Sequence, residues 1–122
     1  MREDHSKYYV RFVLEILALV YIGWWGSLLA PGWWGIFTAI GILAVVMLVW
    51  GVFNVPGDPS RSGKAPVVVS GKVRLFIEAI VFLAATYAIL VISGWLFASL
   101  YLIVVIAHYI HTKGRVKWIL KK

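Results

Sequence analysis

Two long stretches of this 122-residue chain contain no charged side chain. Residues 16–57, 42 in all, and residues 79–112, 34 in all, lack Asp, Glu, Lys and Arg. A hydrocarbon core of about 30 Å is crossed by about 20 helical residues. Each stretch, extended slightly past its flanking glutamate, therefore accommodates two crossings. The sequence predicts four transmembrane helices.

Helix-breaking residues interrupt both stretches near their midpoints. Ala30-Pro31-Gly32 divides the first and Ser93-Gly94 the second. Unbroken, non-alternating apolar runs exclude a β-barrel, and lipid offers no partner to unpaired backbone groups. We therefore expect one all-α membrane domain over residues 1–122, built from two helical hairpins. The expected helices are 8–29, 33–53, 72–92 and 95–112, with a loop at 54–71 and a basic C-terminal tail at 113–122.

The composition excludes a soluble enzyme domain. Hydrophobic residues make up 62% of the chain and charged residues 14%, whereas soluble domains have roughly 45–50% and about 25%. Too few polar side chains are present to cover a water-facing surface. The absence of cysteine also excludes disulfides, thiolate metal sites and cysteine nucleophiles.

The basic residues are confined to three segments. All twelve lie in the N-terminal segment, in the central loop with the entrance to the third helix, or in the tail. They are Arg2, Lys7, Arg11, Arg61, Lys64, Lys72, Arg74, Lys113, Arg115, Lys117, Lys121 and Lys122. Because cytoplasmic segments accumulate such residues, we expect both termini and the central loop to be cytosolic. Anionic lipid headgroups then explain the net charge of +7 without a nucleic acid.

Tryptophan clusters at the other ends of the predicted helices. Trp24, Trp25, Trp33, Trp34 and Trp95 flank the two uncharged turns. Amphipathic rings favour the headgroup zone, so these residues are expected to form an interfacial aromatic belt.

The two predicted hairpins resemble each other in sequence. Arg11 with Glu15 and Arg74 with Glu78 give the same R-x-x-x-E frame at an offset of 63, and Gly32-Trp33 and Gly94-Trp95 recur at an offset of 62. Parallel repeats would be related by an axis along the membrane normal. Chance similarity between apolar helices is the competing explanation.

Several motifs together resemble a known family. RFVLEILAL followed by YIGWWG, then VWGVFNVPGDP, then VRLFIEAIVFLAA resemble the YrdB family of small bacterial four-helix membrane proteins. The similarity runs from about Arg11 to the end of the fourth helix and is most specific at Glu15, Trp50-Gly51 and Glu78. The resemblance implies a multi-pass protein of the bacterial cytoplasmic (inner) membrane, and it implies no mechanism.

Polar residues within the predicted spans form the candidate site, because a charge inside a bilayer costs several kcal/mol, from roughly 2.5 upward. The expected cluster at the cytosolic side is Glu15, Glu78, His108 and His111, with Arg11 and Arg74 as ion-pair partners one helical turn before each glutamate. Two interpretations remain open. The glutamates fix helix depth with snorkelling arginines, or they act with the histidines in proton relay.

A metal site has weaker support in the sequence. His108 and His111 are weak candidate ligands at H-x-x-H spacing. Di-iron bundles use Glu-x-x-His motifs on two helices, and this chain lacks them. We therefore expect no metal and no cofactor.

Two functions are compatible with these patterns. Nucleophile and metalloprotease motifs such as G-x-S-x-G and H-E-x-x-H are absent, so we expect no enzyme. The first function is a non-enzymatic accessory or scaffold component that contacts a membrane protein partner through its helices and its basic cytosolic surface. The alternative is a small proton-coupled or ion transporter or channel, acting as a homo-oligomer with Glu15 and Glu78 as key groups.

Overall fold

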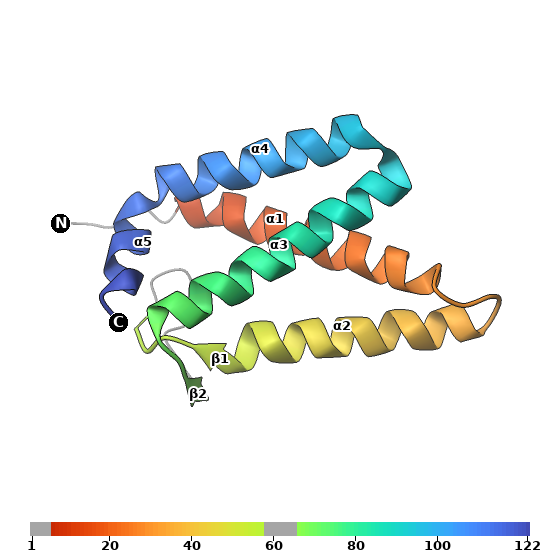
Figure 1. The fold of residues 1–122 in the computed structure, drawn as a ribbon, viewed down its shortest axis with the longest axis horizontal. Helices are drawn as coiled ribbons and strands as arrows, with labels where there is room; N and C mark the ends of the chain where they lie inside the picture. The colour runs from red at the N-terminus through yellow and green to blue at the C-terminus, as the bar shows by residue number, and fades with distance from the viewer. Residues whose placement is uncertain (1–5, 58–65) are drawn as a thin grey trace.

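The computed structural model describes residues 6–57 and 66–122 and is mainly helical (Figure 1). Within these ranges four long helices follow one another: α1 Ser6–Ser27, α2 Trp34–Val52, α3 Gly71–Ser93 and α4 Trp95–His111. A shorter helix, α5 Lys113–Leu120, follows α4. Two short strands, β1 Phe53–Asn54 and β2 Val67–Val68, pair in parallel between α2 and α3.

Glycines allow the sharp turns between consecutive helices. Gly32, between α1 and α2, has a φ of +58°, and Gly94, between α3 and α4, has a φ of +93°. Residues with a Cβ rarely adopt such angles. Gly94 is the single residue between α3 and α4. Its N–H donates to the carbonyl oxygens of Ile89 and Leu90 at 3.2 and 3.1 Å. Each apolar run is thereby divided into two antiparallel helices.

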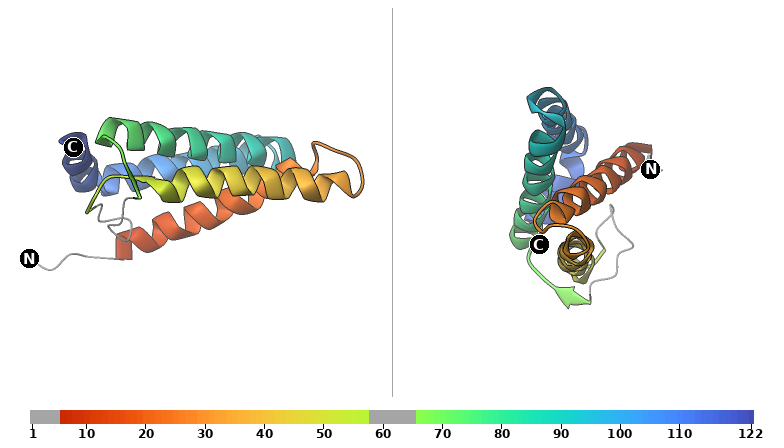
Figure 2. Two further views of the ribbon diagram at one scale, coloured as in Figure 1. Left: turned by 90° about the horizontal axis from the view of Figure 1, so that it is seen from below. Right: turned by 90° about the vertical axis from the view of Figure 1, so that its right-hand side faces the viewer.

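The helices α1 and α3 cross at the centre of the bundle, with α2 packed on α1 and α4 packed on α3 (Figures 1 and 2). Core side chains come from α1, α3 and α4: Leu14, Ala18, Ile22, Val81, Phe82, Ala85, Ile89, Ala98, Tyr101 and Val105. The starts of α1 and α3 lie at the same end as the strands and α5 (Figure 1). We call this end, which contains Arg11, Arg74 and α5, the basic end.

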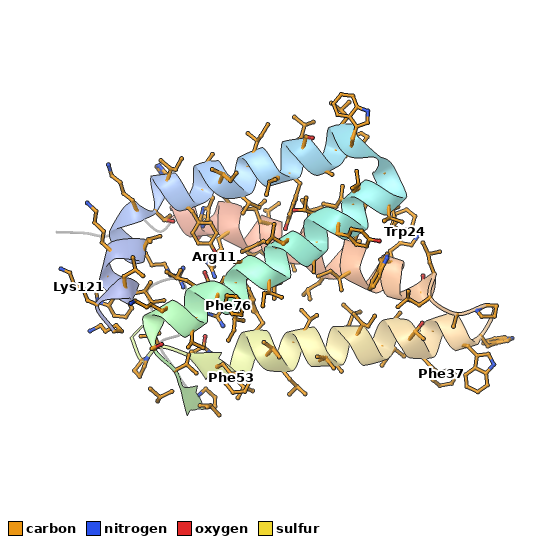
Figure 3. All side chains as sticks on the ribbon, in the orientation of Figure 1. Arg11, Trp24, Phe37, Phe53, Phe76 and Lys121 are labelled. Atoms are coloured by element: carbon orange, nitrogen blue, oxygen red, sulfur yellow. The ribbon has the colours of Figure 1, made fainter. Side chains whose placement is uncertain are left out.

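Three helices in the described residues are long and apolar enough to cross a membrane: Tyr9–Ser27, Trp34–Val52 and Gly71–Ser93. The number rises to four if α4 and α5, which are bent by 69° relative to each other, are counted as one span. Large apolar side chains cover the outside of the bundle, among them Phe37, which projects from α2 (Figure 3). The apolar helices indicate a membrane protein.

Helix ends differ from the expected boundaries by up to two residues, for local reasons. The first helix ends at Ser27 rather than residue 29, because residues 28–33 form the turn. The second ends at Val52 because Phe53 pairs with Val67. The third begins at Gly71, where the Oγ of Ser70 accepts a hydrogen bond from the N–H of Val73 at 3.3 Å.

The central loop and the C-terminal segment contain more regular structure than expected. Within the expected loop at 54–71, Asn54 pairs with Val68, while residues 58–65 lie outside the described part of the chain. The segment 113–122, expected only as a basic tail, contains α5. Because α5 turns by 69° from α4, it lies across the basic end and reaches the start of α3 (Figure 1).

Candidate functional site

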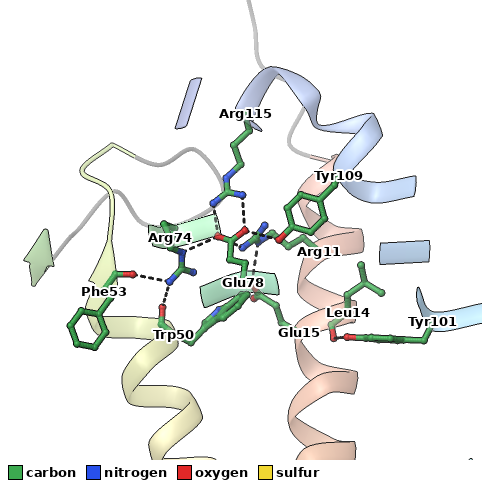
Figure 4. A network of polar contacts seen from close by, with 10 residues as sticks. All are labelled: Arg11, Leu14, Glu15, Trp50, Phe53, Arg74, Glu78, Tyr101, Tyr109 and Arg115. Atoms are coloured by element: carbon green, nitrogen blue, oxygen red, sulfur yellow. Dashed lines mark hydrogen bonds and ion pairs between the residues drawn. The ribbon is translucent and has the colours of Figure 1, made fainter. Parts of the chain in front are cut away.

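Glu78 lies at the centre of a buried polar cluster at the basic end (Figure 4). It lies two turns into α3 and is fully buried. The Oη of Tyr109 donates to Oε1 at 2.6 Å. Arg115 from α5 donates from Nη1 to Oε1 at 3.0 Å and from Nη2 to Oε2 at 2.7 Å. This bidentate geometry is the strongest hydrogen-bonding arrangement between a guanidinium and a carboxylate.

Arg74 joins Glu78 to the end of α2. It lies one turn before Glu78 and donates from Nε to Oε2 at 2.8 Å. Its Nη1 donates to the carbonyl oxygens of Trp50 and Phe53, both at 2.8 Å. A cation at the C-terminus of a helix satisfies the last carbonyls and opposes the negative end of the helix dipole. Arg74 therefore fastens α2 to α3 while holding the carboxylate.

Arg11 connects the two glutamates that the sequence singles out. Its Nε donates to Oε2 of Glu15 at 3.1 Å, and its Nη2 lies 2.9 Å from Oε2 of Glu78. The Arg11 side chain is 2% exposed, whereas that of Glu15 is 19% exposed. The structure thus brings Glu15 and Glu78 to the same arginine, with Glu78 inside and Glu15 at the edge.

Aromatic rings pack against these charged groups and against one another. The ring centroid of Trp50 is 4.6 Å from the Cζ of Arg74 and 5.4 Å from that of Arg11. Phe82 meets the Trp50 ring edge-on at 5.5 Å and the Tyr109 ring at 6.0 Å. Cations over aromatic faces gain further electrostatic stabilisation. We call Arg11, Glu15, Arg74, Glu78, Tyr109 and Arg115 the Glu78 cluster.

Direct backbone contact seats α5 against α3. A Cβ built on Gly71 would overlap the backbone carbonyl of Ile119, so only glycine allows this approach. Ile119 and Arg115 lie one turn apart on α5, and both are buried. At the bend before α5, the Oγ1 of Thr112 donates to the carbonyl oxygen of His108 at 2.9 Å. The contact with Gly71 and the hydrogen bonds to Glu78 together fix the position of α5.

The two histidines do not share one environment. His108 is buried and meets the ring of Tyr109 at 5.6 Å, and its Nε2 has no hydrogen-bond partner in the described part of the chain. His111 is exposed. Within residues 6–57 and 66–122, no group of three or more His, Cys, Asp or Glu side chains could hold a metal ion.

Sequence reasoning missed Tyr109 and Arg115. Both bind Glu78 directly, yet neither lies at helical spacing from it in the sequence. One available signal was the spacing of Arg115 and Ile119, which places an arginine and an isoleucine on one face of a lysine-rich segment. The lysines of this segment are exposed, whereas Arg115 is buried.

Oxygen atoms of Glu78 are fully occupied by donors, which limits the chemistry of the cluster. Oε1 receives two hydrogen bonds, and Oε2 lies within 3 Å of three guanidinium groups. Such a carboxylate is a poor base, because a proton would have to displace these partners. The arrangement holds helices together.

Comparisons with known proteins agree with the extent of the fold. The family model described as "Protein of unknown function (DUF2568)" matches residues 9–107. The chain is 36% identical over 119 residues to "Uncharacterized protein YrdB" of Bacillus subtilis (strain 168), covering 98% of this chain and 97% of that protein. No solved structure matches the chain. The match to the family model includes Glu15 and Glu78 and ends before Tyr109.

Proposed function

This chain belongs to the DUF2568 family of proteins of unknown function, and from that premise we propose that it is a non-enzymatic accessory or scaffold component of the bacterial cytoplasmic membrane. The resemblance to the YrdB family that the sequence suggests is confirmed. Neither comparison assigns an activity, so support for this function comes from the Glu78 cluster and from the distribution of charge.

The main support for this proposal is that one buried carboxylate connects four helices. Glu78 on α3 binds Arg11 from α1, Tyr109 from α4 and Arg115 from α5. Arg74 extends the same network to α2. Breaking a buried pair is strongly unfavourable, so the basic end is held in one arrangement. A fixed end suits a protein that presents a surface to a partner.

Charge supports a topology with both termini and the central loop in the cytosol. The described basic residues gather at the basic end, whereas the turns at residues 28–33 and at Gly94 carry no charge. Lys121, the residue after α5, projects away from the bundle (Figure 3). Trp33 and Trp95 are exposed at the opposite end, as interfacial anchors would be. This topology gives four spans as two hairpins, with exposed lysines near anionic headgroups.

The recurrence of R-x-x-x-E supports a parallel internal repeat. In both halves the arginine donates from Nε to the glutamate one turn later, at 3.1 Å for Arg11 and 2.8 Å for Arg74. The two halves then differ, because Glu78 is buried and Glu15 is partly exposed. We propose that a duplicated hairpin diverged, with one glutamate becoming the centre of the cluster.

Transport through a homo-oligomer is the alternative function. It requires that Glu15 and Glu78 bind and release an ion or a proton. The contacts of Glu78 weigh against that role, because three arginines already neutralise it. Glu15 is more accessible. If transport is the function, Glu15→Gln and Glu78→Gln should each abolish flux while the protein still accumulates in the membrane.

Purification of the intact complex tests the accessory role. The tagged chain, expressed at its native level, is extracted in mild detergent, and the mass of the complex is measured. A second protein at fixed stoichiometry supports the proposal. A lone monomer or a homo-oligomer contradicts the accessory role and favours transport.

Single-cysteine labelling tests the topology separately, because the natural chain has no cysteine. Pro31→Cys lies in an uncharged turn and Lys121→Cys at the basic end, and both positions are exposed. A membrane-impermeant maleimide should label position 31 in intact cells and position 121 only after the membrane is opened. The reverse pattern would overturn the orientation and leave the accessory role to the purification experiment.

A further inference from the structure

A groove of about 330 Å³ opens on the outside of the bundle where α1, α2 and α3 meet. The view along the bundle in Figure 2 shows these three helices side by side. The groove is lined by residues of all three helices, including Ile16 from α1, Met47 and Gly51 from α2, and Phe82 from α3. The volume lies at the lower end of the range typical of small-molecule pockets. Apart from Glu15 the lining is mainly apolar, which fits a hydrocarbon chain.

Glu15 is the one charged residue among those that line this groove in the described part of the chain. Its side chain is 19% exposed, whereas those of Arg11, Arg74 and Arg115 are 2% or less. A molecule in the groove can therefore reach the carboxylate, which also accepts a hydrogen bond from the buried Nε of Arg11 at 3.1 Å. Glu15 also lies toward the basic end, where the lipid headgroups would be.

We propose that this groove binds an aminophospholipid, with one acyl chain along the apolar lining and the headgroup ammonium on the carboxylate of Glu15. An acyl chain that leaves the bilayer for a protein groove gains no hydrophobic free energy, because lipid tails are as apolar as leucine. Selection among lipids must therefore come from the headgroup. A carboxylate selects a cation that donates hydrogen bonds.

The groove is too small to enclose a helix of a second protein, which is about 10–12 Å across with its side chains. Such a helix could lie over the groove but not within it. A single acyl chain is narrow enough. The proposal depends on the membrane location of the chain and is independent of the accessory role.

Native mass spectrometry tests the proposal with defined lipids. The full chain in detergent is mixed with phosphatidylethanolamine or with phosphatidylglycerol, and the lipid-bound fraction is measured. The net charge of +7 would by itself favour the anionic phosphatidylglycerol. We expect the opposite order, with phosphatidylethanolamine retained by roughly fivefold, the value of a partly exposed ion pair.

Two variants and one matched control locate the binding. Glu15→Gln removes the charge and should abolish the preference. Gly51→Leu adds a bulky side chain to the wall of the groove, and it should lower retention of both lipids. A Cβ at Gly51 meets no atom within 4 Å, so the backbone has room for a side chain there. Gly41→Leu is the control, since Gly41 also lies on α2 with open space around it and does not line this groove.

Each outcome decides the proposal. Loss of the preference in Glu15→Gln, with reduced retention in Gly51→Leu and normal retention in Gly41→Leu, supports it. Phosphatidylglycerol bound as well as or better than phosphatidylethanolamine by the natural chain overturns it. Unchanged retention in Gly51→Leu also overturns it, even if Glu15→Gln fails to fold. None of these results depends on whether a protein partner exists.

Discussion

Replacing Glu78 with glutamine should destabilise the protein far more than replacing Glu15. Glu78→Gln keeps the size of the side chain and removes its charge. In the natural chain, Arg11, Arg74 and Arg115 face the carboxylates of Glu15 and Glu78. The variant leaves three buried guanidinium groups with one carboxylate at the edge of the cluster. Repulsion among the arginines then replaces attraction.

The burial of each glutamate sets the expected magnitudes. Removing one partner of a buried ion pair costs about 3–5 kcal/mol, and the Glu78 side chain is 1% exposed. Glu15 is 19% exposed, so its pair falls nearer the surface value of about 1 kcal/mol or less. For a chain of this size, Glu78→Gln should lower the unfolding temperature by roughly 10 °C or more and Glu15→Gln by a few degrees.

Arg115→Met provides a comparator on the other side of the same contact. The cluster contains three arginines and two glutamates, so this variant removes the excess positive charge. Methionine can still pack beside Ile119. It should therefore cost less than Glu78→Gln, although Glu78 loses two hydrogen bonds. The double variant Glu78→Gln with Arg115→Met should be less destabilised than the sum of the two, because part of the repulsion is gone.

Thermal unfolding in detergent, followed by circular dichroism and by size-exclusion profile, measures these differences. All variants should first be shown to insert into the membrane. Equal losses of stability for Glu78→Gln and Glu15→Gln would refute the reasoning, because burial would then have no effect on the cost. A larger loss for Arg115→Met than for Glu78→Gln would show that α5 docking, and not the carboxylate, dominates stability.

Two further predictions concern the contacts around Glu78. Gly71→Ala should detach α5, because the new Cβ would overlap the carbonyl of Ile119. The control Gly114→Ala lies in α5 with open space around it and should be neutral or stabilising by up to about 1 kcal/mol. Only Gly71→Ala should make α5 sensitive to protease. Tyr109→Phe removes a hydrogen bond to the Glu78 carboxylate and should cost about 1.5–3 kcal/mol, measured by the same thermal assay.

Local sequence signals predicted the helices and the short-range pairs well. Charges and helix breakers located the apolar runs, since a bilayer tolerates few charges and Gly94 turns where few other residues can. Helical spacing also predicted that Arg11 could reach Glu15 and that Arg74 could reach Glu78, and the structure shows these contacts at 3.1 and 2.8 Å. Such information is contained in segments of a few residues.

Contacts between distant segments could not be predicted in this way. Tyr109 lies 31 residues and Arg115 lies 37 residues from Glu78. Their approach depends on the packing of α4 against α3 and on the bend of 69° before α5. A uniformly apolar surface gives no periodic signal for packing order, because lipid-facing and core-facing residues are alike. The basic composition of residues 113–122 indicated only a cytosolic tail.

The balance of charge explains why α5 needs a close backbone fit as well as a salt bridge. Arg11 with Glu15 and Arg74 with Glu78 form two pairs that are neutral without α5. Arg115 therefore enters a site that is already neutral and must lose its hydration to do so, which costs several kcal/mol. Two hydrogen bonds to Glu78 recover part of this cost. The burial of Ile119 against Gly71 adds a further apolar contribution, and this close approach requires a glycine at the start of α3.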